Sequence, residues 1–328
     1  MEVGVQATGT PAATQGITTG GGPPPAPDQQ YDGIMQQLVD ALLQMVADMQ
    51  SKQPAAAQAA TGPATLAGGP LAYQSMPAEA GTQATQSAGA VGQPPAGSTF
   101  RIASFNFLGS SHTAAGGNKP GYRSGAQRAK DAVEYLDRNG VDVAGFQEFQ
   151  GSQQQAFRKL KPGWKMVVQQ DNAIAWNDEK FKLVKQQSVT IPYFEGNPRK
   201  MPVVQLEDRA TGKRVWMVDV HNPASTKDHP GNEASRDKAT KIEQQLLDRL
   251  RATGLPVLLV GDFNEATEAR KKFSSMDGFH AYAPSRMKTG IDMIFGSSDV
   301  AFSDAKIDRA TQSSKTSDHP MVVATATL

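Results

Sequence analysis

Acidic, amide and imidazole side chains follow several apolar runs of this sequence, each at the point where the run stops. The clearest case is LPVLLVGDFN, where a run typical of a buried strand leads into Asp262 and Asn264. Other runs end in the same way, at Asn106, at Gln147 and Glu148, and at His221. Carboxylate and amide oxygens are ligands for hard cations, and carboxylates and imidazoles can transfer protons. These residue types could therefore bind a metal ion and perform acid–base chemistry.

Further polar residues of this kind lie toward the end of the chain. Ser317, Asp318 and His319 precede a final apolar run, and Asp292 is the second residue of the run IDMIFG. In layered α/β folds, side chains at one edge of a sheet gather over a single crevice even when they are distant in sequence. Singly, each of these residues is more often structural than functional, and only the joint pattern predicts a shared site. Three histidines outside the pattern are interpreted as structural, namely His112, His229 and His280.

Alternating strands and helices must position these residues from Thr99 onward. Strand-like runs occur at TFRIASFN, VDVAGFQ, WKMVVQQ, NAIAWN, MPVVQLED, KRVWMVDV, PVLLVG, IDMIFG and PMVVATATL. Two amphipathic helices are indicated by apolar faces made of Ala126, Ala129, Val133 and Leu136, and of Ala239, Ile242, Leu246 and Leu250. The turn RATG predicts a hairpin and therefore antiparallel pairing. This mixture predicts a layered α/β or α+β domain over residues 99–328.

Residues 1–98 have a different composition and are predicted to be a largely disordered leader. They consist mainly of Ala, Gly, Gln, Thr and Pro, which bury too little apolar surface to offset the entropy of ordering. One amphipathic helix is predicted at about residues 31–50, where Met and Leu recur at heptad spacing. It is either a transient helix or a segment for self-association or docking on another protein.

Composition excludes several classes of protein. The chain contains no cysteine, so disulfide scaffolds and thiolate metal sites are excluded and any metal must use oxygen and nitrogen ligands. Lys52 is the one basic residue before Ser98, so the net charge of +1 combines an acidic leader with a mildly basic body. No apolar run is long enough to span a membrane, and the start MEVGVQATGT has no Sec-type signal. A cytoplasmic location is favoured, and export by a route without such a signal stays open.

The ordered motifs resemble those of a known superfamily. Asn106, the QE of residues 147–148, the strand-ending His221, GDFN at 261–264, Asp292 and the terminal SDH at 317–319 occur in the order found in the endonuclease/exonuclease/phosphatase superfamily. These are DNase-I-like metal-dependent phosphoesterases, and the resemblance covers about residues 99–328. It implies a four-layered α/β sandwich with two central mixed β-sheets and an active site at one end of the sandwich.

The resemblance also implies a role for each motif residue. It assigns Mg²⁺ or Mn²⁺ to Glu148, with Asn106 and Asp318 as additional ligands. Asp262 would orient or deprotonate the attacking water, and Asn264 would hold that carboxylate or bind phosphate.

Two histidines complete the set that the resemblance implies. His319, with Asp292 fixing its tautomer and favouring the protonated ring, would donate a hydrogen bond to a phosphate oxygen, and His221 would do the same across the phosphate. No expected position of the motif is visibly replaced.

The substrate is less defined than the chemistry. Two basic and aromatic segments are candidates for contact with nucleic acid, NKPGYRSG with Lys119, Tyr122 and Arg123, and YFEGNPRKM with Tyr193, Arg199 and Lys200. Both could equally be solvated loops. Together with the resemblance, these segments favour an endonuclease or exonuclease. A phosphatase or phosphodiesterase for a small-molecule or lipid phosphate is an alternative, as is a non-catalytic assembly protein acting through the helix at 31–50.

Overall fold

The computed structural model describes residues 97–227, 229–283, 287–288 and 290–328. The leader up to residue 96, with the helix predicted at about residues 31–50, lies outside the described residues. The account that follows concerns the domain that begins at Gly97.

Six strands form the first sheet, in the order β11-β12-β1-β2-β4-β3. Its strands are β1 (Thr99–Asn106), β2 (Val143–Gln147), β3 (Trp164–Gln169), β4 (Asn172–Asn177), β11 (Ala301–Asp308) and β12 (Met321–Thr327). β1 and β2 are parallel, and every other neighbouring pair in this sheet is antiparallel. The sheet is therefore mixed.

The second sheet repeats this plan, in the order β5-β6-β7-β8-β10-β9. Its strands are β5 (Phe181–Pro192), β6 (Pro198–Asp208), β7 (Arg214–His221), β8 (Val257–Asp262), β9 (Phe279–Ala281) and β10 (Asp292–Ser297). β7 and β8 are the one parallel pair among these strands. The hairpin predicted at RATG is confirmed as the antiparallel pair β6–β7.

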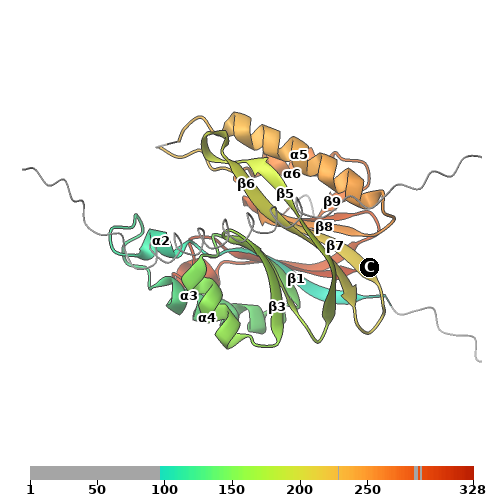
Figure 1. The fold of residues 1–328 in the computed structure, drawn as a ribbon, viewed down its shortest axis with the longest axis horizontal. Helices are drawn as coiled ribbons and strands as arrows, with labels where there is room; N and C mark the ends of the chain where they lie inside the picture. Colours follow the sequence, from blue (N-terminus) through green and yellow to red (C-terminus); the bar gives the residue numbers. More distant parts are fainter. Residues whose placement is uncertain (1–96, 228, 284–286, 289) are drawn as a thin grey trace, which may run out of the picture. The chain divides into compact units, whose positions relative to one another are not determined.

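Helices cover the outer face of each sheet (Figure 1). α3 (Gly125–Arg138) and α4 (Gly151–Leu160) pack on the first sheet, and α5 (Glu233–Arg251) and α6 (Thr267–Ser274) pack on the second. Three short helical segments lie in loops, α2 (Ser110–Thr113), η1 (Phe194–Gly196) and α7 (Ala310–Ser313). The prediction of a four-layered α/β sandwich with two central mixed sheets is confirmed for this domain.

The central core lies between the two sheets, and along β8 and β10 its apolar side chains give way to acidic ones. Leu258 and Val260 of β8 are buried in this core, and strand alternation places Asp262 on the same face. Ile294 of β10 is likewise in the core, and Asp292 shares its face. The apolar layer between the sheets therefore ends in acids at one end of the sandwich.

A buried arginine holds the loops at that end. Arg128 lies on the buried face of α3 and is 0% exposed. Its guanidinium donates to the backbone carbonyls of Phe107 and Leu108, which follow β1, and of Thr316, which lies in the loop before β12. A guanidinium has five N–H donors in a fixed plane, so one side chain can satisfy several carbonyls at once. Arg128 thereby joins the loop that follows Asn106 to the loop that contains Ser317, Asp318 and His319.

The helices were compared with the length and apolarity of a membrane span. None of those in the described part of the chain is long and apolar enough to cross a membrane. The cytoplasmic location suggested by the sequence stays a prediction.

Candidate active site

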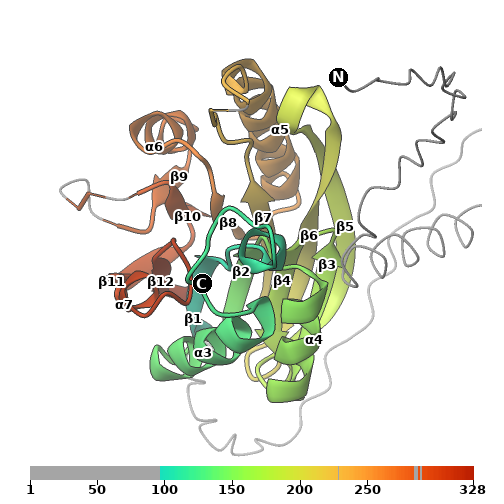
Figure 2. The same cartoon turned by 90° about the vertical axis from the view of Figure 1, so that its left-hand side faces the viewer.

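Strand register brings the motif residues together at one end of the two sheets. Asn106 lies opposite Gln147 across the parallel pair β1–β2. His221 lies opposite Asp262 across the parallel pair β7–β8, and Asp262 lies opposite Asp292 across the antiparallel pair β8–β10. Figure 2 views this end of the sandwich, with the helices of the two outer layers on opposite sides. Pairing alone therefore aligns polar groups that are distant in sequence.

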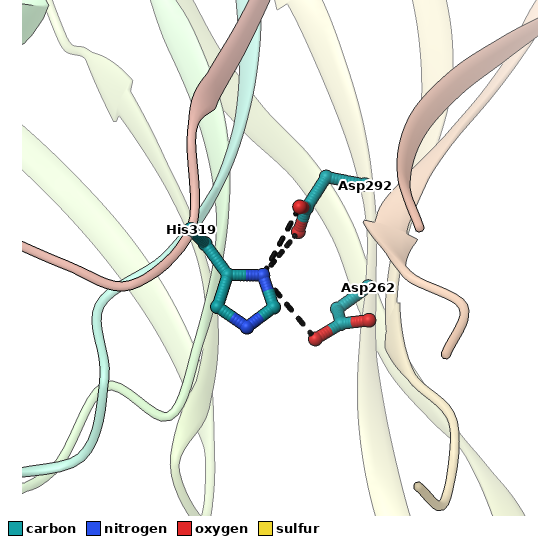
Figure 3. A group of neighbouring side chains, drawn as sticks. All are labelled: Asp262, Asp292 and His319. Carbon is teal, nitrogen blue, oxygen red and sulfur yellow. Dashed lines mark hydrogen bonds and ion pairs between the residues drawn. The ribbon is translucent and has the colours of Figure 1, made fainter. Parts of the chain in front are cut away.

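His319 and two aspartates form a close group (Figure 3). Nδ1 of His319 is 3.0 Å from Oδ2 of Asp292 and 3.7 Å from Oδ2 of Asp262, and both aspartates are buried. Burial lowers the pKa of His319, but the carboxylates of Asp292 and Asp262 outweigh it and raise that pKa to about 10. The ring is therefore protonated at neutral pH, and its second nitrogen points away from Asp292.

The same three side chains have the composition of a cation site. Their ligand atoms lie within 4.8 Å of one another. Because the raised pKa of His319 places a proton on the nitrogen that faces the carboxylates, that nitrogen acts as a hydrogen-bond donor rather than a ligand. The geometry favours a protonated His–Asp pair.

Asp262 is at the centre of the hydrogen-bond network. It accepts from Nδ2 of Asn106 at 3.0 Å and from the backbone N–H of Asn264 at 2.9 Å, and Nε2 of His221 is 3.7 Å away. Nδ2 of Asn264 donates to the backbone carbonyl of Asn222 at 2.7 Å. The side-chain nitrogen of Asn264 therefore ties two strand ends together, while its backbone holds the Asp262 carboxylate.

Glu148 lies beside this network and is held as an anion. Its carboxylate accepts from Nδ2 of Asn106 at 3.1 Å and from the backbone N–H of Gly109 at 2.8 Å, and Nε2 of His112 is 3.3 Å away. Burial raises the pKa of Glu148, but the hydrogen bonds from His112 and Gly109 and the charge of His221 bring it well below its usual range. Asn106 bridges this anion to Asp262.

Asp318 has one carboxylate oxygen available for a ligand. Its Oδ2 accepts from Nζ of Lys119 at 2.7 Å, whereas Oδ1 is buried and has no hydrogen-bond partner among the described residues. A buried carboxylate oxygen without a donor is costly unless a cation or water satisfies it. Glu148 and Asp318 both offer carboxylate oxygens, the ligand type that suits Mg²⁺ or Mn²⁺. Asn106 fits less directly, because its Oδ1 already accepts from the backbone N–H of Leu108 at 2.9 Å.

Lys119 would compete with any cation bound by Asp318, and this leads to a prediction. Replacing Lys119 by Met removes a positive charge from the carboxylate and frees its Oδ2. We expect the affinity for Mn²⁺ to rise about two- to fivefold, since a half-exposed ion pair contributes at most about 1 kcal/mol. Calorimetric titration with Mn²⁺ in the absence of substrate measures the change. Lys130→Met, at an exposed position of α3, is the control and should leave the affinity unchanged. Unchanged or weaker binding by Lys119→Met would contradict the competition.

The residues predicted to bind substrate have varied environments. Arg199 forms an ion pair with Asp171 and stacks on the ring of Tyr193, with its guanidinium carbon 4.1 Å from the ring centroid. The hydroxyl of Tyr193 is 3.3 Å from Nδ1 of His221, so this group lines the site. Arg123, by contrast, is exposed and paired with Asp131 of α3.

Tyr122 and Lys200 differ from this group. Tyr122 is half-buried and lies in the loop before α3, and Lys200 is exposed on β6. The segment containing residues 193–200 therefore has the closer connection to the site, through Tyr193 and Arg199.

Two residues at the site were missed by sequence reasoning. His112, interpreted as structural, contacts Glu148. Asp219 of β7 is fully buried one layer below the site and accepts a hydrogen bond from Gln147 at 2.5 Å. Its carboxylate occupies the space that a side chain at Gly145 would need, because a Cβ there would lie 2.5 Å from Asp219 Oδ1. Asp219 was detectable as an acid inside an apolar strand, two residues before His221 and hence on the same face.

Comparison with known proteins identifies the family of this chain. The model of the Endonuclease/Exonuclease/phosphatase family matches residues 103–319. A search of the curated proteins found no match.

Several solved structures share the fold at low sequence identity. A mannosyl-6-phosphatase of Bacteroides thetaiotaomicron is 20% identical, with a TM-score of 0.55 over 70% of this chain and 100% of its own. The catalytic domain of human Nocturnin with bound sulfate is 18% identical, with a TM-score of 0.57 over 70% of this chain and 93% of its own. TDP2 of D. rerio, in complex with a single-stranded DNA product, is 16% identical, with a TM-score of 0.53 over 70% of this chain and 99% of its own. The match over residues 103–319 shows that this chain belongs to the endonuclease/exonuclease/phosphatase family.

Proposed function

We propose that the domain is a divalent-metal-dependent phosphoesterase that hydrolyses phosphodiester bonds in nucleic acid. One observation carries the proposal: Asn106 bridges Glu148 to Asp262, so a cation-binding carboxylate and a proton acceptor share one hydrogen-bond donor. Nδ1 of the protonated His319 is 3.7 Å from Oδ2 of Asp262. A candidate cation-binding carboxylate, a base and a cationic donor are therefore connected through Asn106 and Asp262, as phosphoester hydrolysis requires.

Asp262 would act as the base. As water attacks phosphorus, a proton passes from the water to an Asp262 oxygen while the new P–O bond forms. The bond from phosphorus to the ester oxygen then breaks, and the departing oxygen takes a proton from solvent water, so the products are a phosphomonoester and an alcohol. Hydrogen bonds from Asn106 and from the backbone of Asn264 keep the carboxylate oriented toward the site.

The histidines would stabilise the charge that develops on phosphate. His319 can donate from the ring nitrogen that is not used by Asp292, and its positive charge is held in place by that aspartate. His221, buried between Tyr193 and Asp262, would donate from the opposite side. Fixed donors of this kind act without the reorganisation that water would need.

Glu148 and Asp318 would hold the metal ion, with Asn106 as a weaker candidate ligand. A bound Mg²⁺ or Mn²⁺ supplies neutralisation of the phosphate charge. The remaining oxygen of Asp318, buried and without a partner among the described residues, supports this assignment.

Nucleic acid is favoured as substrate by the aromatic and cationic groups beside the site. The partly exposed Phe194 contacts Tyr193 edge to face, and Arg199 stacks on Tyr193, so an aromatic and a cationic group of the kind that contact unpaired bases and backbone phosphates lie beside the site. The TDP2 structure with a single-stranded DNA product is consistent with this choice. The mannosyl-6-phosphatase makes a phosphorylated small molecule the alternative substrate.

A substrate panel tests the proposal. The purified protein is incubated with supercoiled plasmid, single-stranded DNA, RNA and a set of phosphomonoesters, each with Mg²⁺, Mn²⁺ or EDTA. We expect cleavage of nucleic acid that EDTA abolishes. Turnover of phosphomonoesters alone would replace the nuclease by a phosphatase, and turnover that persists in EDTA would reject the metal mechanism. No turnover of any phosphate ester would favour the assembly protein.

The leader is proposed to act in association rather than in catalysis. A chain that starts at Gly97 should remain folded and keep its turnover number, because the described residues contain both sheets and all four layers. Deletion should reduce self-association or docking, since the Met and Leu stripe predicted at residues 31–50 requires an apolar partner. Light scattering and turnover assays on the full-length and shortened proteins measure both effects. An unfolded shortened protein would contradict this division into domain and tether.

A further inference from the structure

Asn222 connects the ends of the two strands that carry His221 and Asp262. Its backbone N–H donates to the carbonyl of Asp262 at 2.9 Å, and its own carbonyl accepts from Nδ2 of Asn264 at 2.7 Å. Asn222 is 1% exposed and directly follows His221. A displacement of Asn222 would therefore move the histidine relative to the base, which makes the contacts of its side chain important.

Glu243 of α5 provides the one hydrogen bond to that side chain among the described residues. Nδ2 of Asn222 donates to Oε2 of Glu243 at 3.3 Å. Glu243 is 0% exposed, although it belongs to a helix whose other acids are exposed. A fully buried acid that contacts only an amide is unusual, because burial of a charge normally requires a cation as partner.

Glu243 and Asn222 each have one side-chain oxygen without a hydrogen-bond donor among the described residues. Oε1 of Glu243 and Oδ1 of Asn222 are both buried and lack a hydrogen-bond partner among the described residues. If the acid is ionised, both atoms are acceptors and neither can satisfy the other. One added proton resolves both defects, since a carboxylic acid can donate through its O–H to the amide oxygen while it accepts from the amide nitrogen.

We propose that Glu243 is a positioning residue that acts in its neutral form, as one half of a reciprocal acid–amide pair that fixes Asn222. Through Asn222, the pair holds His221 at a constant distance from Asp262 and Asn264. This proposal rests on the proposed function, in which these residues act on phosphate and water. It adds a residue on the outer helical layer that no site motif contains.

The charges around Glu243 agree with a neutral acid. Its pKa is raised to about 8. Burial is the main cause and the charge of Glu265 adds to it, whereas the hydrogen bond from Asn222 and the charge of Lys272 oppose it. The nearby cations are already paired, because Arg236 and Lys272 both form ion pairs with Glu265. The acid therefore stays protonated at neutral pH and ionises as the pH rises above about 8.

The pH dependence of stability follows from the sign of this shift. The folded-state pKa lies above the ordinary value of 4.5, so the folded protein binds more protons than the unfolded chain between these two values. Stability attributable to Glu243 is therefore complete below about pH 4.5 and falls as the pH rises toward about 8. A glutamine at this position would remove that dependence.

Three variants test the proposal. Glu243→Gln keeps both hydrogen bonds of the pair without a titratable proton, Glu243→Ala removes the pair, and Asp248→Asn changes an exposed acid of the same helix as control. At pH 7 we expect E243Q to retain at least half of kcat, and E243A to lose about tenfold in kcat with little change in KM. The wild type and Asp248→Asn should lose kcat between pH 7 and 9.5, and E243Q should lack this alkaline loss.

Two readouts do not depend on any substrate. Between pH 6 and 8, the melting temperature of the wild type should fall by about 5 °C relative to E243Q. Infrared difference spectra should show a protonated carboxyl band at pH 7 that E243Q lacks. An E243Q variant with the wild-type alkaline loss, a kcat as low as that of E243A, or the absence of that band would overturn the proposal. If no phosphate ester is hydrolysed, the proposed function fails, while the melting and infrared experiments still decide the state of Glu243.

Discussion

Asp262→Asn is expected to lose about 100- to 10,000-fold in kcat, with the fold intact. An amide cannot accept the proton of the attacking water, and general base assistance is worth about this factor. Asn has nearly the shape of Asp, so its oxygen can still accept a hydrogen bond from Asn106 or from the backbone of Asn264. Single-turnover kinetics on a substrate identified in the panel, with Mg²⁺ at saturation, measure the loss.

The control for this variant is an aspartate of the same domain that lies outside the site. Asp277→Asn changes an exposed side chain in the loop between α6 and β9 and should keep wild-type kcat. The melting temperatures of both variants should lie close to that of the wild type, because neither position contributes a large apolar contact. If Asp262→Asn retains more than a tenth of the wild-type kcat, Asp262 is not the base.

Arg128→Met should greatly reduce the stability of the domain, because Arg128 is a fully buried cation. Its guanidinium donates to the backbone carbonyls of Phe107, Leu108 and Thr316, among others, and Met removes this donor from the buried acceptors. Each unsatisfied buried group costs about 1–3 kcal/mol, and part of this is recovered because Gln153 also donates to two of the carbonyls. We expect the free energy of unfolding to fall by about 3–5 kcal/mol, measured by urea denaturation at pH 7.

Arg123→Met is the matched control for Arg128→Met. Arg123 lies five residues earlier in the chain, but its side chain is half exposed and forms a surface ion pair with Asp131. Such pairs contribute about 0–1 kcal/mol, so the loss should be small. Equal losses in the two variants would show that Arg128 is not the anchor of the two loops.

The strands that carry the site could be predicted because their composition is unambiguous. β2, β8 and β10 are buried along their whole length and consist mainly of apolar residues before or after the polar motif. Their parallel or antiparallel pairing then determines which polar ends meet. A layered domain with polar strand ends gathered at one edge could therefore be anticipated from these patterns, whereas the four-layered sandwich was implied by the family resemblance.

Several elements could not be predicted because their patterns are weak. β5 is an edge strand with a long exposed central stretch rich in Lys and Gln, and β11 is also largely exposed. α4 buries only Gln153 and Phe157, so no apolar stripe marks it. These elements form because neighbouring strands and helices supply partners, which a local pattern does not contain.

The residues in and around the site that could not be predicted either lie in a loop or are ionisable side chains buried on a helix. His112 contacts Glu148 because of the conformation of the loop after β1. A hydrogen bond between Nδ1 of His112 and Oδ1 of Asn118 lies within this loop. Arg128 and Glu243 are residues of ionisable type on helices, where solvent exposure is the usual expectation. Their burial depends on backbone carbonyls and on Asn222, whose positions follow from the tertiary fold.

The pairing of β12 with β1 has a consequence for how the protein is made. Thr99 lies opposite Thr327, so the first strand of the domain requires the last strand as its neighbour. Ribosomes release a chain from its N-terminal end, and contacts between such distant segments form late in folding. Asp318 and His319, just before β12, join the other site residues only at this stage. A nascent chain therefore has no complete site, and the domain becomes competent for chemistry only after its final strand has left the ribosome.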